Sequence, residues 1–323
     1  MYAGGMRGVA LAVCAVAVLA GCGSDERAEE GAGPKWRTLA PSKLARTEVA
    51  AARVGRHVYV MGGFVRAGFT SAATERYDIV RDRWTRVANM PVALNHAAAL
   101  AYRKHVYVLG GYSAERALDG EVATLYRYDP KRDRWRRLPS MPTARGALAV
   151  GVIGSRLYAA GGASDGTVHT ELEIYDFKRR RWTAGPALPT GRDHLAGAVA
   201  QRHFYALAGR APGHGNYDIV EVYDPRSQRW HVAPPMAKPR GGIGAATVGG
   251  QIVVAGGEES QGTIAEVERY DPRRRRWTRL RDLPTPRHGL GVISRGRRVY
   301  VIEGGDHPGF AFTRTVEMLD LSR

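Results

Sequence analysis

The chain has 323 residues, 44% of them hydrophobic, so it can bury a large core and wholesale disorder is excluded. Its two cysteines, Cys14 and Cys22, both lie near the N-terminus, which excludes a disulfide framework in the rest of the chain. The formal net charge of +17 is compatible with an anionic partner, but we favour arginines spread over solvated turns, and the export signal described next argues against nucleic acid.

The N-terminus has the pattern of a processing signal. The apolar run at residues 8–20 is shorter than the roughly 20 residues that a membrane-spanning helix needs, and it fits the core of a signal peptide. The quartet that follows, Leu19-Ala20-Gly21-Cys22, resembles the lipobox of bacterial lipoproteins, in which cleavage precedes the cysteine and its sulfur carries a diacylglycerol. The alternative is an ordinary thiol behind a secretory signal.

The sequence therefore predicts three segments. Residues 1–21 form a lipoprotein signal peptide, residues 22–34 a flexible tether that is small, acidic and without periodicity, and residues 35–323 the folded domain. The resemblance implies that lipidated Cys22 anchors an exported protein to the extracytoplasmic face of the cell membrane, in a periplasm or on the cell surface.

Six tryptophans divide the folded domain into repeats, with spacings of 48, 51, 47, 48 and 47 residues. The tryptophans are Trp36, Trp84, Trp135, Trp182, Trp230 and Trp277. Glycine doublets recur with the same period, at Gly62-Gly63, Gly110-Gly111, Gly161-Gly162, Gly256-Gly257 and Gly304-Gly305, and the fourth repeat has Ala208-Gly209. A Tyr-Asp pair stands seven residues before five of the tryptophans, at Tyr77, Tyr128, Tyr175, Tyr223 and Tyr270.

Each repeat contains short apolar runs and turn residues but no helical periodicity, which predicts an all-β fold. The period, the glycine doublet, and the Tyr followed by Trp together resemble the kelch repeat across residues 35–323. The resemblance implies a monomeric six-bladed β-propeller with four-stranded blades around a channel. The last repeat ends without a tryptophan strand, so we expect the strand at residues 35–39 to complete the sixth blade and close the ring.

Charged residues also recur in phase with the repeat. Arginine begins the predicted innermost strand in five repeats, at Arg46, Arg145, Arg192, Arg240 and Arg287. Glutamate stands two residues before the Tyr position, at Glu75, Glu173, Glu221, Glu268 and Glu317. The second repeat lacks both and has Leu94 and Tyr126 instead, so we expect a structural pair within each blade. The alternative is a ligand-binding arginine ring at the channel mouth that includes Arg145, Arg192 and Arg240.

The kelch resemblance places ligands on the loops after the doublets and between the blades. The other candidate ligand-binding residues on these loops are Asn95, His96, Arg116, Asp193, His194, Arg210 and His288. The histidines come from different repeats without His-x-His or Cys spacing, so the sequence predicts neither a metal site nor a cofactor. No catalytic motif is evident, and the copper site of galactose oxidase, which also has a kelch propeller, needs a cysteine that the mature chain lacks.

We therefore expect an envelope-anchored interaction module that presents a loop face to a protein or a glycan. The alternative is a carbohydrate-active enzyme like the periplasmic sialic-acid epimerase that shares the six-bladed kelch fold, an analogy of fold alone. The turns within the blades are rich in basic residues such as Arg273–Arg276. That face either approaches anionic lipid headgroups or wall polymers, or it simply tolerates charge.

Overall fold

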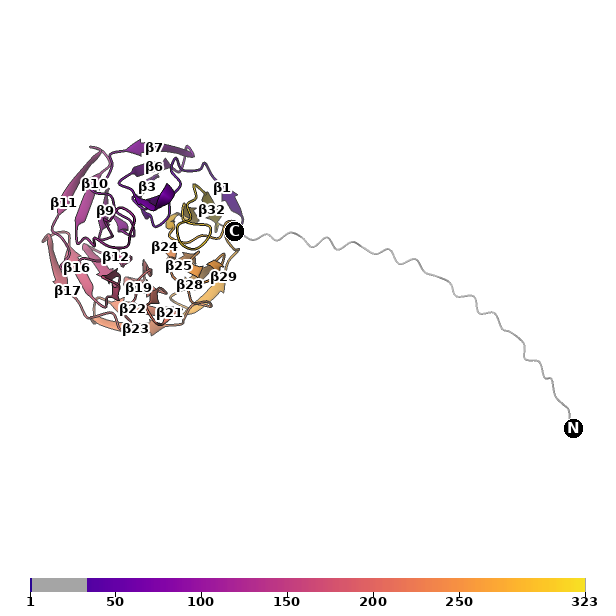
Figure 1. Cartoon of the computed structure of the whole chain (residues 1–323). Helices are drawn as coiled ribbons and strands as arrows, with labels where there is room; N and C mark the ends of the chain where they lie inside the picture. The colour runs from indigo at the N-terminus through magenta and orange to yellow at the C-terminus, as the bar shows by residue number, and fades with distance from the viewer. Residues whose placement is uncertain (2–33, 323) are drawn as a thin grey trace. The chain divides into compact units, whose positions relative to one another are not determined.

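Six four-stranded antiparallel sheets are arranged as blades around a central channel (Figure 1). This computed structural model describes Met1 and residues 34–322, so the predictions for the signal peptide, for Cys22 and for most of the tether lie outside the described part. Within that part, no helix has the length and apolar character needed to cross a membrane. The architecture confirms the predicted all-β, six-bladed propeller.

Each blade orders its strands from the channel outward. The first three blades contain β2 (Ala50–Val54), β3 (His57–Met61), β6 (Thr74–Asp78) and β7 (Arg83–Val87); β8 (Ala98–Tyr102), β9 (His105–Leu109), β10 (Leu125–Asp129) and β11 (Arg134–Leu138); and β12 (Ala149–Ile153), β13 (Arg156–Ala160), β16 (Leu172–Asp176) and β17 (Arg181–Ala184). The fourth and fifth contain β18 (Ala196–Ala200), β19 (His203–Leu207), β22 (Val220–Asp224) and β23 (Arg229–Ala233); and β24 (Gly244–Val248), β25 (Gln251–Ala255), β28 (Val267–Asp271) and β29 (Arg276–Arg279).

The sixth blade joins the two ends of the described chain. Its strands from the channel outward are β30 (Gly291–Arg295), β31 (Arg298–Ile302), β32 (Val316–Asp320) and β1 (Trp36–Thr38). Strand β1 pairs antiparallel with β32, with Trp36 opposite Leu319. This confirms the predicted closure of the ring, which leaves no gap between the first and last blades and covers the edge of β32.

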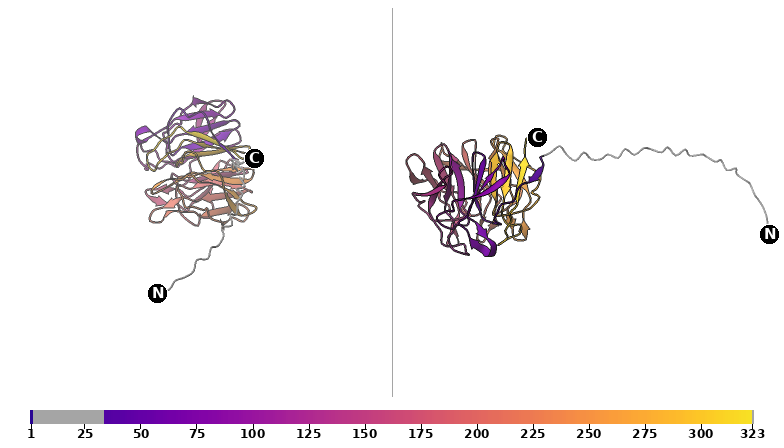
Figure 2. Two further views of the ribbon diagram at one scale, coloured as in Figure 1. Left: turned by 90° about the vertical axis from the view of Figure 1, so that its right-hand side faces the viewer. Right: turned by 90° about the horizontal axis from the view of Figure 1, so that it is seen from above.

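The strands run between two faces of the ring (Figure 2). We name the mouth face by its four small hairpins: β4 (Phe64–Val65) with β5 (Phe69–Thr70), joined by the 3-10 turn η1 (Arg66–Gly68); β14 (Ala163–Ser164) with β15 (Thr167–Val168); β20 (Arg210–Ala211) with β21 (Gly215–Asn216); and β26 (Glu258–Glu259) with β27 (Gly262–Thr263). The opposite face, the turn face, carries the tight turns within the blades, including the exposed arginines Arg273–Arg276.

Apolar side chains fill the spaces between successive blades. The last four residues of the second strand in each blade are apolar and almost fully buried, as Val58–Met61 of β3 shows, because neighbouring blades cover both of its faces. One such core combines Tyr59 and Met61 of the first blade with Val106 and Tyr128 of the second. A single blade could not bury these residues, so stability depends on stacking and on the closed ring.

The tryptophans lock each blade to the connection that leaves the preceding blade. All six indole N–H groups donate to a backbone carbonyl oxygen at 2.8–3.0 Å. In chain order from Trp36 the acceptors are Arg281, Ala40, Ala88, Pro139, Pro186 and Pro234. Five tryptophans also lie beside the repeat tyrosine of their own blade, with ring centroids 5.0–5.3 Å apart. This shared role explains why the tryptophan period is so regular.

The doublet position requires left-handed backbone at two consecutive residues. In the first blade Gly62 and Gly63 have φ of 64° and 83°. In the last blade the residues with this conformation are Glu303 (φ 56°) and Gly304 (φ 99°), whereas Gly305 has no positive φ. The assignment of Gly304-Gly305 as the sixth doublet was therefore wrong by one residue, and a buried glutamate occupies a place that is otherwise glycine or alanine.

Candidate functional site

The recurring arginines lie inside the blades. They stand four residues ahead of the innermost strands rather than at their first residue, and all five side chains are fully buried. Each contacts the expected glutamate of its own blade: Arg46–Glu75 at 3.1 Å, Arg145–Glu173 at 2.6 Å, Arg192–Glu221 at 2.5 Å, Arg287–Glu317 at 2.7 Å, and Arg240–Glu268. The predicted pairing is confirmed, and in the second blade buried Leu94 and Tyr126 replace it.

Each arginine also caps the strand that precedes the doublet. Arg192 donates through Nε to the carbonyl of Ala208 (2.6 Å), and its other nitrogens donate to the carbonyls of Ala206 (3.0 Å) and Thr190 (2.7 Å). A guanidinium with these partners is committed to the blade. Arg145, Arg192 and Arg240 are therefore structural residues in this fold and do not form an open ring at the mouth.

A second repeated position forms the inner rim of the mouth face. It lies two residues after the arginine position, and all six members have left-handed backbone: Glu48, His96, Ala147, His194, Gly242 and Gly289. From blade to blade, the N–H of each later member donates to the carbonyl of the one before, at 2.9–3.2 Å. The N–H of Val49 closes the circle by donating to Gly289. At this ring position Glu48, His96 and His194 carry polar side chains that line the channel.

Those three side chains meet across the ring from blades one, two and four. His96 Nε2 lies 3.1 Å from His194 Nε2 and 3.2 Å from Glu48 Oε2. The two histidine side chains are 4% exposed and that of Glu48 is 11% exposed. Among the described residues, this is the one group of at least three residues whose histidine and carboxylate ligand atoms all lie within 4.8 Å of one another.

A second layer of polar side chains surrounds them, and we call the whole set the mouth cluster. Asn95 Oδ1 contacts His96 Nδ1 at 2.7 Å, and Asp193 Oδ1 contacts His194 Nδ1 at 2.9 Å. The remaining members are Arg210, which lies 2.8 Å from both His194 Nε2 and Glu258 Oε1, and His288, whose Nδ1 lies 3.1 Å from Glu48 Oε1 and 3.4 Å from Glu258 Oε2.

Burial and neighbouring charge set the ionisation of this cluster. Burial lowers the pKa of His96 to about 3, against the opposing charge of Glu48. Burial opposes ionisation of Glu48, but the surrounding histidines outweigh it and hold the pKa of Glu48 far below its usual range. Burial also acts against protonation of His288, yet the hydrogen bond to Glu48 and the charge of Glu258 raise its pKa. Near neutral pH the cluster therefore presents a carboxylate beside a neutral imidazole.

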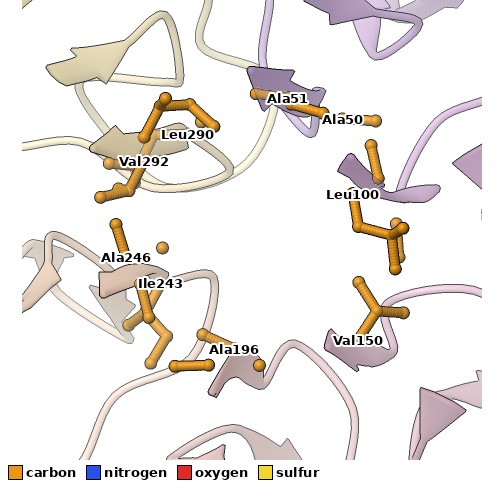
Figure 3. A pocket seen from close by; sticks show the side chains of 18 of the residues that line it. Ala50, Ala51, Leu100, Val150, Ala196, Ile243, Ala246, Leu290 and Val292 are labelled. Atoms are coloured by element: carbon orange, nitrogen blue, oxygen red, sulfur yellow. The ribbon is translucent and has the colours of Figure 1, made fainter. Parts of the chain in front are cut away.

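Most of the side chains that line the channel below the cluster are apolar. Its cavity of about 480 Å³ is lined by the innermost strands of all six blades, with Glu48, His96 and His194 at the mouth end. Figure 3 shows alanine, valine, leucine and isoleucine side chains surrounding the open centre. Glu48, His96 and His194 thus stand at the mouth end of a channel whose lining also includes the polar side chains of Arg53, Thr247 and Ser294.

The structure brings together six of the residues singled out from sequence: Asn95, His96, Asp193, His194, Arg210 and His288. Arg116 lies apart on a loop of the second blade, with its guanidinium 3.8 Å from the ring centroid of Phe69. Sequence reasoning missed Glu48, although a signal existed. Glu48 stands two residues after Arg46, as His194 does after Arg192.

Comparison with known proteins agrees with this fold. The profile of the KLHDC2/KLHL20/DRC7 Kelch-repeats domain matches residues 48–239, and the Kelch motif matches residues 239–284. The chain belongs to the kelch-repeat family. Among solved structures, the kelch propeller is similar to one titled "Structure of YjhT", with a TM-score of 0.73 and 17% identity over 86% of this chain and 96% of that chain. At this identity the likeness shows the fold alone. No curated protein matches the chain.

Proposed function

We propose that this kelch propeller is an interaction module that binds its ligand on the mouth face. The observation that carries the proposal is the distribution of polar chemistry. The five arginine–glutamate pairs are accounted for by blade assembly, whereas the mouth cluster gathers polar and charged residues from four blades at the rim of the channel. Sites in repeat scaffolds of this kind lie on loops that a rigid core positions.

The loops of the mouth face are held in place before any ligand arrives. Hydrogen bonds join loops of neighbouring blades, from Thr70 to Glu115 (2.7 Å), from Asn216 to Glu258 (2.7 Å) and from Thr263 to Asp306 (3.0 Å). Such preorganisation lowers the entropic cost of binding. We infer that the ligand meets a fixed surface.

A hollow beside Arg210 offers polar contacts on this face. Its volume is about 630 Å³, and its lining includes Arg210, Asn216, Lys238, Glu258 and Glu259. Donors and acceptors so close together suit hydroxyl and carboxylate groups, as in a sugar or a peptide segment. We propose a protein or a glycan of the cell envelope as the ligand. No observation beyond the shared fold favours the sugar epimerase alternative, and we do not propose it.

We propose further that the protein is exported and anchored through lipidated Cys22, on the strength of the lipobox-like quartet and the apolar run before it. Metabolic labelling with a palmitate analogue tests this. The wild-type protein should be labelled and sediment with membranes, and the Cys22→Ala variant should lose both properties. Equal labelling of the two proteins would refute the lipid anchor.

A thermal-shift panel tests the binding site. The purified protein is screened against sialic acids, uronic acids, neutral sugars and envelope polymers, and a ligand at 100 times its dissociation constant should stabilise it by about 2.7 kcal/mol. Arg210→Ala should abolish the shift, and Arg229→Ala, at an exposed site away from the mouth cluster, should retain it. No shift directs the search to protein partners by pull-down. A ligand whose binding ignores Arg210→Ala and other mouth substitutions would contradict the proposal.

A further inference from the structure

Three electron-pair donors converge at the centre of the mouth cluster. The Nε2 atoms of His96 and His194 are 3.1 Å apart, and His96 Nε2 is 3.2 Å from Glu48 Oε2. All three atoms lie within 4.8 Å of one another. In a tetrahedral zinc site with bonds of about 2.0–2.1 Å, the ligand atoms are about 3.3 Å apart. The side chains are therefore already close to the spacing that one small cation imposes.

Each of the three groups is oriented by a partner on its far side. Asn95 Oδ1, at 2.7 Å, is an acceptor, so His96 Nδ1 carries the hydrogen and Nε2 keeps its lone pair. The Asn95 amide is fixed in this sense because its nitrogen donates to Thr70 Oγ1 (2.9 Å) and faces the carbonyl of Ala117 (3.5 Å). An imidazole whose Nε2 binds a metal must carry its hydrogen on Nδ1, as His96 does here.

The same logic holds for the other two groups. Asp193 Oδ1 accepts from His194 Nδ1 at 2.9 Å, so the lone pair of His194 lies on Nε2, where it accepts a hydrogen bond from Arg210 at 2.8 Å. His288 Nδ1 lies 3.1 Å from Glu48 Oε1 and holds that oxygen, so Oε2 points at the histidines. Metal-binding imidazoles almost always have such a partner on the opposite ring nitrogen.

We propose that Glu48, His96 and His194 bind a divalent transition-metal ion. Zn²⁺ suits the donor set best, because two imidazoles and one carboxylate form a familiar three-ligand site with a fourth position open to water or substrate. The guanidinium of Arg210, now 2.8 Å from His194 Nε2, turns aside when the ion binds and keeps its contacts with Glu258 (2.8 Å) and Asp193 (3.7 Å). The 480 Å³ channel cavity reaches all three ligands and gives the ion a path of entry.

Titration of the whole purified chain tests the site. After treatment with a chelator, the protein is titrated with ZnCl₂ by calorimetry and with Co²⁺ by absorption spectroscopy. Wild-type protein should saturate at one ion per chain and give the intense d–d bands of tetrahedral Co²⁺. His96→Ala and His194→Ala should weaken binding at least 100-fold, and His231→Ala, an exposed histidine on β23, should leave it unchanged.

A variant that keeps the ligands guards against loss of folding. Asp193→Asn removes the carboxylate behind His194 and should weaken Zn²⁺ binding about 10- to 100-fold without losing the one-to-one stoichiometry. Zn²⁺ should raise the unfolding temperature of the wild-type protein and not that of folded His194→Ala. The proposal would be overturned if the wild-type chain did not bind Zn²⁺. It would also be overturned if His96→Ala and His194→Ala bound Zn²⁺ as tightly as the wild-type protein. Metal binding is measured without the protein or glycan ligand, so the result is independent of the proposed function.

Discussion

The buried pair of the fourth blade offers a quantitative test of why arginine and glutamate recur together. Arg192 and Glu221 have fully buried side chains, and Arg192 satisfies three backbone carbonyls in addition to the carboxylate. The second blade has the same architecture with Leu94 and Tyr126 at the two positions. The molecule therefore contains a charged pair and an apolar pair at equivalent positions, and the apolar pair of the second blade can be introduced into the fourth blade by substitution.

Arg192→Leu leaves the Glu221 carboxylate buried with one remaining side-chain donor, the Thr190 hydroxyl at 3.0 Å. Removing one partner of a buried ion pair costs about 3–5 kcal/mol, a large share of the roughly 5–15 kcal/mol that a typical native protein has. The double variant Arg192→Leu/Glu221→Tyr copies the second blade and removes the stranded charge. It should recover at least about 2 kcal/mol of that loss, although the carbonyls that Arg192 capped lose their donor.

Urea unfolding followed by tryptophan fluorescence measures these differences. The midpoint should fall strongly for Arg192→Leu and return part of the way for the double variant. Arg229→Ala, at an exposed site in the same blade, is the control and should stay within about 0.5 kcal/mol of wild type. A double variant no more stable than Arg192→Leu, or a single variant as stable as wild type, would refute the structural role of the pair.

Two further predictions concern Glu303 and a repeat tryptophan. Glu303 and Glu75 share the guanidinium of Arg46, and burial raises the pKa of Glu303 from 4.5 to about 7. Its protonated form is favoured in the native state, so the stabilisation is complete below pH 4.5 and is lost as the pH rises through 7. Glu303→Gln should remove about 3 kcal/mol of this pH dependence, and an unchanged slope of urea stability between pH 5 and 8 would contradict it. Trp135→Phe removes the hydrogen bond to the Ala88 carbonyl and part of the ring beside Tyr128, and it should cost at least about 1 kcal/mol by urea midpoint. No loss of stability would contradict a stabilising role of this hydrogen bond.

The sequence predicted the fold well because the markers of the repeat are local and periodic. Trp36 without a preceding doublet, and Leu319 without a following tryptophan, together indicated how the ring closes. The joint absence of arginine and glutamate from the second repeat predicts their pairing, which the distances confirm. Such residues recur in the sequence because each blade packs against its neighbours in the same way.

The mouth cluster is harder to predict because its residues do not recur from repeat to repeat and therefore leave no periodic pattern in the sequence. One glutamate and two histidines, Glu48, His96 and His194, come from blades one, two and four, and they meet only because the ring brings the same repeat position to one axis. The sequence also did not predict that the left-handed pair of the last blade is Glu303-Gly304. The adjacent pair Gly304-Gly305 imitates the motif, and only the backbone angles identify the true position.

Photo-cross-linking in envelope extracts tests most directly whether the mouth face is the functional end of the propeller. Benzoylphenylalanine is placed at Phe310, on a mouth loop, or at Val80, on the turn face, two apolar residues that are 58% and 60% exposed. Discrete adducts from position 310 and none from position 80 are the predicted result. Adducts from position 80 alone would contradict the assignment and make the basic turn face the interaction surface.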